Sequence, residues 1–88
     1  MVYEGVNVEV KKDTYDRSTK IKLSLISMKS GEPLIAATIR FDGNDLAEGE
    51  VTVRPALLKF LLANGIVSEP LYFYKYGSIK YPVCKCLI

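Results

Sequence analysis

The sequence predicts a small α+β domain: an antiparallel sheet of about five strands, in the order β-β-β-α-β-β, with one helix packed on one face. Period-two alternation of apolar and polar residues occurs both before and after a single segment with helical periodicity. Turn residues separate these segments. The 88 residues are enough for one modest core, so we treat residues 1–88 as a single domain.

Three alternating segments make up the first half of the predicted sheet. Valines alternate with polar residues over Val2–Lys12, and apolar residues alternate again over Lys20–Met28 and Leu34–Phe41. This pattern is typical of strands with one buried face. The polar stretch Asp13–Thr19 and the turn cluster Lys29–Pro33 separate the three segments. We therefore expect a three-stranded meander.

An acidic segment, Asp42–Glu50, follows the third strand. Asn44 is a residue type that caps helices, so the segment is predicted either as a single helical turn beginning there or as a plain loop. Val51–Val53 is predicted as a short extended piece.

The clearest helix spans Pro55–Asn64. Proline is favoured at a first helical position, and Asn64-Gly65 supplies the left-handed residue at which helices end. Ile66 is then placed to fold back on the last turn. The apolar stripe that should pack on the sheet consists of Leu57, Leu58, Leu61 and Leu62.

The segment Leu71–Cys86 is predicted to form a hairpin, because Gly77 can adopt the positive φ that a tight turn requires. A two-residue loop at Tyr76-Gly77 and a four-residue loop over Lys75–Ser78 give the same register. In that register Tyr74 faces Ile79, and Tyr72 faces Tyr81.

Both faces of this hairpin are more apolar than a solvated face should be. One face carries Tyr72, Tyr74, Ile79, Tyr81 and Val83, and the other carries Leu71, Phe73, Pro82 and Cys84, edged by Lys75 and Lys80. One face should meet the core of the domain, and the other needs a different cover. That cover is a second copy, a partner protein or stacked bases. The alternative is that the helix covers one face and loops cover the other.

Little in the sequence indicates catalysis or a bound metal. The chain has no histidine, which removes the commonest general base and metal ligand. Cys84 and Cys86 lie two apart on one strand with parallel side chains, so we expect no disulfide between them. Two thiolates are too few for a zinc site within one chain. The carboxylates of the acidic segment are interpreted as solvated, and their spacing does not fit a calcium loop. We therefore expect no enzyme activity, no metal and no cofactor.

The charge balance is that of an ordinary globular protein, with 12 Lys and Arg against 10 Asp and Glu. A net charge of +2 is too small to indicate nucleic-acid binding by itself. The chain contains neither an apolar run long enough to span a membrane nor a secretory signal. We expect a cytoplasmic protein, or one in the host-cell interior if a virus encodes it, with no membrane partner.

The chemistry therefore favours a small non-enzymatic binding protein. We expect a regulator or inhibitor, of the kind that a phage or virus can encode, which docks on a protein of unknown identity through the aromatic hairpin; a homodimer is the first form expected. The predicted partner-binding residues are Tyr72, Tyr74, Tyr76, Ile79 and Tyr81. The alternative is a domain that binds single-stranded nucleic acid with these tyrosines and with Lys75, Lys80 and Lys85.

Overall fold

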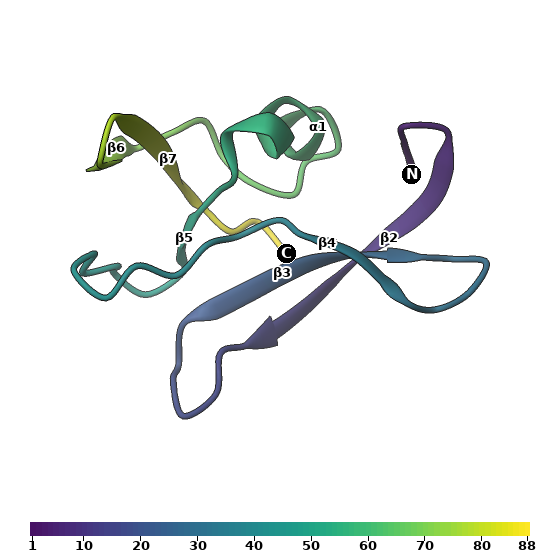
Figure 1. The fold of residues 1–88 in the computed structure, drawn as a ribbon, viewed down its shortest axis with the longest axis horizontal. Coiled ribbons are helices and arrows are strands. Elements are labelled where there is room, and N and C mark those ends of the chain that lie inside the picture. Colours follow the sequence, from purple (N-terminus) through teal and green to yellow (C-terminus); the bar gives the residue numbers. More distant parts are fainter.

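The computed structural model describes all 88 residues as a small, strand-rich α+β fold with two antiparallel sheets. The first sheet has the order β1-β2-β3-β4 and the second has the order β5-β7-β6. Figure 1 shows α1, β6 and β7 on one side of the molecule and β2, β3 and β4 on the other. The strands are β1 (Val2–Tyr3), β2 (Val6–Thr14), β3 (Ile21–Ser27), β4 (Pro33–Ala36), β5 (Glu50–Thr52), β6 (Tyr72–Tyr76) and β7 (Ile79–Lys85).

The prediction of a single five-stranded sheet is wrong, because the C-terminal hairpin does not pair with the meander. Instead β7 pairs with β5, with Val51 opposite Cys84 and Thr52 opposite Val83. The predicted extended piece is therefore the strand that receives the hairpin. Its residue Val51 is fully buried and belongs to the core.

The first predicted strand is also interrupted, near its beginning. Glu4 and Gly5 adopt positive φ angles of 48° and 79°, so the chain reverses and Val2 pairs with Asn7. A glycine in the left-handed region is typical of a tight hairpin turn. The alternation of valines therefore continues across a turn that its period does not reveal.

The segment 37–39 joins the two sheets. On one side the Ala37 amide donates to the carbonyl of Leu23 in β3, at 2.8 Å, and on the other the Ala37 carbonyl accepts from the Arg54 amide at 2.9 Å. Thr38 and Val53 form an isolated antiparallel bridge at the same place. The third strand, predicted over Leu34–Phe41, therefore leaves the first sheet at Ala36. The residues that follow lead to the second sheet.

The core lies between the two sheets and under the helix. A 3-10 turn over Pro55–Leu57 leads into α1 (Leu58–Ala63), close to the predicted span. Ile66 donates to the Leu61 carbonyl and Gly65, with φ of 68°, donates to that of Leu62, which is a Schellman ending. The core cluster consists of Val8, Leu23, Leu25, Ala37, Val51, Val53, Leu57, Leu61, Ile66, Val67 and Cys84.

Candidate functional site

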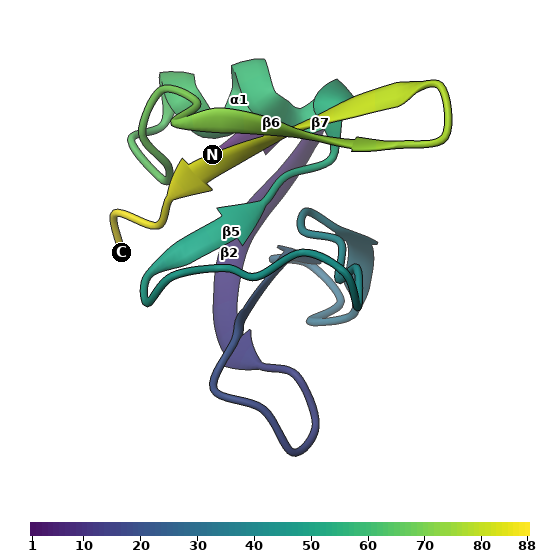
Figure 2. The ribbon, with the colours of Figure 1, turned by 90° about the vertical axis from the view of Figure 1, so that its left-hand side faces the viewer.

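The hairpin of β6 and β7 forms as predicted, but its register differs by two residues. Tyr74 faces Tyr81 and Tyr76 faces Ile79, so the loop is Gly77-Ser78. Gly77 has φ of 64° at the first loop position, where a type II′ turn places glycine. A shift of two residues leaves every side chain on its predicted face. In Figure 2 the hairpin extends past the helix to this turn.

One ring from a distant segment anchors the tyrosine face of the hairpin. Phe41 belongs to the segment that connects β4 of the first sheet to β5 of the second. Its ring centroid lies 4.7 Å from that of Tyr76, 5.3 Å from that of Tyr74 and 4.8 Å from that of Tyr81. These separations and tilts are favourable for aromatic pairs. We call Phe41, Tyr74, Tyr76 and Tyr81 the tyrosine cluster. It covers part of the face that the sequence assigned to a partner.

The loop that follows Phe41 holds the other end of this face. Asn44 donates from Nδ2 to Thr52 Oγ1 at 2.7 Å and accepts a long hydrogen bond, 3.4 Å, from the Tyr72 hydroxyl. Partial burial raises the pKa of the Tyr72 phenol, and the carboxylates of Glu50 and Asp45 raise it further. The loop passes so close to β6 that a Cβ on Gly43 would lie 3.0 Å from the Tyr74 hydroxyl.

The predicted partner-binding residues thus divide into two groups. Tyr74 and Tyr81 are half-buried in the tyrosine cluster, while Tyr72, Tyr76 and Ile79 are 40%, 59% and 49% exposed. Phe73, on the other face of β6, and Leu71, directly before the strand, are each 55% exposed. We call the five exposed apolar residues the exposed hairpin surface: Leu71, Tyr72, Phe73, Tyr76 and Ile79.

The structure brings together two of the three predicted lysines. Lys75 and Lys80 lie directly opposite each other, both exposed, on the same face as Phe73. Like charges in this position destabilise a strand pair. Lys85 lies at the far end of β7, where its Nζ donates to the Glu48 carbonyl at 3.2 Å. It is therefore not part of the same basic surface.

Neither cysteine is placed for surface chemistry. Cys84 is a fully buried core residue, and Cys86 is half-buried. Burial, with a smaller contribution from Glu69, raises the pKa of the Cys84 thiol to about 11. A protonated, enclosed thiol is a poor nucleophile and a poor metal ligand. No group of three or more Cys, Asp or Glu side chains is arranged to hold a metal ion.

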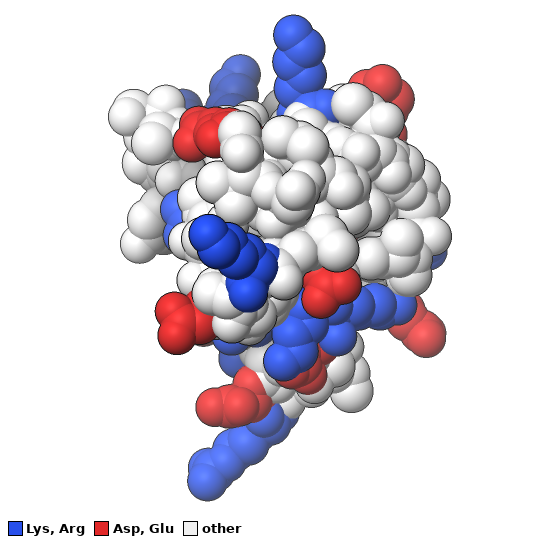
Figure 3. Space-filling view, turned by 90° about the vertical axis from the view of Figure 1, so that its right-hand side faces the viewer, with Lys and Arg blue, Asp and Glu red and all other residues white.

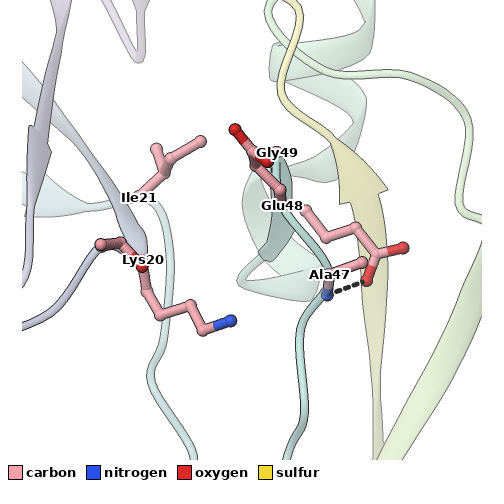
Figure 4. A pocket seen from close by; sticks show the side chains of 7 residues that line it. Lys20, Ile21, Ala47, Glu48 and Gly49 are labelled. Carbon is pink, nitrogen blue, oxygen red and sulfur yellow. Dashed lines mark hydrogen bonds between the residues drawn. The ribbon is translucent and has the colours of Figure 1, made fainter.

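The acidic segment forms a loop without a helical turn, and it borders a cavity of about 360 Å³ (Figure 4). Lys20 projects from the opposite wall, and its Nζ donates to the Leu46 carbonyl. The Glu50 carboxylate accepts a hydrogen bond from the Ala47 amide at 2.9 Å. Glu50 therefore caps the Ala47 amide within the loop, and Lys20 ties the loop to the segment before β3.

Sequence reasoning missed two aromatic residues of the site. It placed Phe41 at the end of a strand, although its position directly before the glycine-containing acidic loop was a signal that the chain turns there. It placed Phe73 on the face opposite the predicted contact residues, and the structure leaves that side chain exposed.

A second apolar region lies at the other end of the molecule and was not predicted. Tyr3, Val6, Leu34 and Ile35 line an open groove of about 430 Å³ together with Glu4. The face shown in Figure 3 has a broad area without charged side chains.

Comparison with known protein families, curated proteins and solved structures finds no match to this chain. No helix of the structure is both long enough and apolar enough to cross a lipid bilayer.

Proposed function

We propose that this chain is a small non-enzymatic binding protein that docks on a protein partner through the exposed hairpin surface. One observation carries the proposal: five of the twelve large apolar side chains that the fold leaves exposed lie on this hairpin. Aromatic and aliphatic groups gathered on a projecting element are typical of interface centres. The regulator or inhibitor role and the cytoplasmic or host-cell setting belong to the same proposal.

Two features make this surface suited to binding. The tyrosine cluster fixes one face of β6 from behind, so the exposed side chains are held on a supported strand. β6 is also the last strand of its sheet and pairs only with β7. A supported strand loses little conformational freedom on binding, which favours affinity.

The direct test changes exposed residues and leaves the tyrosine cluster in place. A photo-crosslinking phenylalanine analogue at Phe73 should give defined adducts in cells of the source, whereas the same analogue at Lys59 on α1 should not. Phe73→Ser should remove contacts without unfolding the domain, as checked by circular dichroism. Equal adducts at the two positions would contradict the proposal.

Self-association is included in the proposal, because a second copy can cover the same surface around a twofold axis. Light scattering coupled to size-exclusion chromatography gives the mass. A dimer that Phe73→Ser and Ile79→Ser convert to monomer would identify the second copy as a partner. A dimer unaffected by both changes would place its interface elsewhere.

A second candidate function is binding of single-stranded nucleic acid. The observation that favours it is the pair Lys75 and Lys80 beside exposed Phe73 on one face, since such binders combine basic groups with rings on which bases stack. Fluorescence anisotropy with labelled oligothymidine tests it. Lys75→Ala should weaken binding and lower its salt dependence, whereas Lys85→Ala, at the other end of β7, should not.

A further inference from the structure

We propose that the outer edge of β6 binds an extended acidic segment of a partner protein, which joins the second sheet as an added strand. This inference rests on the proposed docking function and specifies the partner's chemistry. Strand addition is a common mode of recognition, in which main-chain hydrogen bonds give affinity and alternate side chains give specificity.

The edge of β6 is available for such an addition. The sheet order β5-β7-β6 leaves one side of β6 without a neighbour. In Figure 1 β6 lies at the margin of the molecule, and in Figure 2, seen from that side, it lies in the foreground. The strand contains no proline, and its five residues pair with β7 without a register shift. It therefore lacks two of the devices that block edge pairing.

The positive charge near this edge favours a partner segment that carries negative charge. Lys75 on β6 and Lys80 on β7 are opposite each other and exposed, so their repulsion weakens the isolated hairpin. A carboxylate on a strand next to β6 would lie beside Lys75 and relieve that repulsion. A second copy of this chain would instead bring two more lysines to the junction.

Side-chain alternation gives the pattern of the added strand. Phe73 and Lys75 share one face of β6, so the residues opposite them should be apolar and acidic. Tyr72 and Tyr76 lie on the other face and are exposed, although Tyr76 also stacks on Phe41. Tyr74 between them is half-buried against Phe41. The partner segment therefore needs no large side chain opposite Tyr74.

The test uses a capped seven-residue peptide that carries, on one face, a valine to lie opposite Phe73 and a glutamate two residues away to lie opposite Lys75, with threonine at the other positions. Its control is the same peptide with lysine in place of the glutamate. Amide shifts of the isotope-labelled protein are followed by NMR during titration. We expect the glutamate peptide to bind more tightly, by about threefold to fivefold for one well-placed pair, with shifts concentrated in β6.

A charge exchange provides the sharpest control. The double variant Lys75→Glu, Lys80→Glu should reverse the preference and favour the lysine peptide, while Lys59→Glu on α1 should leave it unchanged. Methylation of alternate peptide amides should remove binding if the peptide pairs as a strand. A glutamate peptide that tolerates this methylation would show charge attraction alone and would overturn the inference.

Other results separate this inference from the proposed function. A stable dimer that Phe73→Ser dissociates would mean that a second copy occupies the hairpin, which supports docking but overturns the acidic partner. Equal binding of the two peptides, or shifts centred away from β6, would also overturn it. Crosslinks at Phe73 that match those at Lys59 would remove the docking function itself.

Discussion

β6 and β7 are neighbouring strands of one hairpin, both rich in apolar residues, yet they have opposite roles in the fold. In β7 the consecutive residues Pro82, Val83 and Cys84 are buried. In β6 only Tyr74 is even half-buried, and Tyr72 and Phe73 are exposed. The difference follows from position, because β7 lies between β5 and β6 while β6 has one neighbour.

An apolar strand becomes part of the core, or stays exposed as a contact surface, according to which other segments of the chain cover it. β7 is covered because β5 pairs with it and the core cluster reaches Cys84. β6 is covered only where Phe41 reaches its tyrosines. The rest of β6 keeps its apolar side chains at the surface, and that remainder is the candidate contact site.

Removing the ring of Phe41 should have the largest effect on this arrangement. Phe41→Ala should lower the free energy of unfolding by about 2 to 3 kcal/mol, somewhat below the cost for a fully buried phenylalanine. The cause is the loss of three aromatic contacts that hold β6 and β7. Urea denaturation measures it.

Phe73→Ala is the matched control for Phe41→Ala, because it deletes the same ring from an exposed position. It should change the free energy of unfolding by about 0.5 kcal/mol or less. Similar losses for the two variants would mean that both rings belong to the core.

The directly opposed residues Tyr72 and Val83 compare the two strands at one position. Val83→Ala should cost about 2 kcal/mol, because two buried methyl groups are lost and a cavity remains. Tyr72→Ala removes a much larger side chain but should cost about 1 kcal/mol or less, since Tyr72 is a partly exposed member of a cross-strand pair. If Tyr72→Ala cost more than Val83→Ala, β6 would contribute more to the stability of the domain than β7 at this position.

The buried thiol of Cys84 should make the β7 side of the hairpin sensitive to alkaline pH. Its pKa is raised to about 11 in the fold, against about 8.5 for a free thiol. Above pH 9 the unfolded chain loses this proton while the folded chain keeps it, so stability should fall as pH rises toward 11. Denaturation midpoints from pH 8 to 11 should fall more steeply for the native chain than for Cys84→Ala.

The last prediction concerns an increase in the stability of the free hairpin. Lys80→Glu places a carboxylate opposite Lys75 and should stabilise the free hairpin by about 0.2 to 1 kcal/mol. The same change should weaken binding of an acidic strand. Lys11→Glu on β2, which faces Ser24, is the control and should not stabilise the domain in this way. No gain from Lys80→Glu would mean that the two lysines do not repel measurably.

Local signals allowed much of the secondary structure to be predicted. The helix and its ending followed from Pro55, Gly65 and Ile66, because the capping requirements are local in sequence. β3 also lies within its predicted segment. The division into two sheets did not follow, because the pairing of β5 with β7 joins residues more than thirty apart and no local pattern encodes it.

The candidate site was predicted in composition but not in detail. Alternation assigned each hairpin residue to the correct face, and the structure preserves those faces in a shifted register. The contact between Phe41 and the tyrosines depends on a loop that folds back across the sheet. For that reason the sequence could not distinguish Tyr74 and Tyr81, which become half-buried, from Tyr76, which contacts Phe41 and stays exposed.

Amide hydrogen exchange, followed by NMR along β6 and β7 of the free protein, shows whether the outer edge of β6 is open. We expect alternate amides of β6, those on its outer edge, to exchange rapidly, while the amides of Val83 and Cys84 are protected as strongly as the core. Uniform protection along β6 would contradict this assignment, because it would show that the outer edge is already paired.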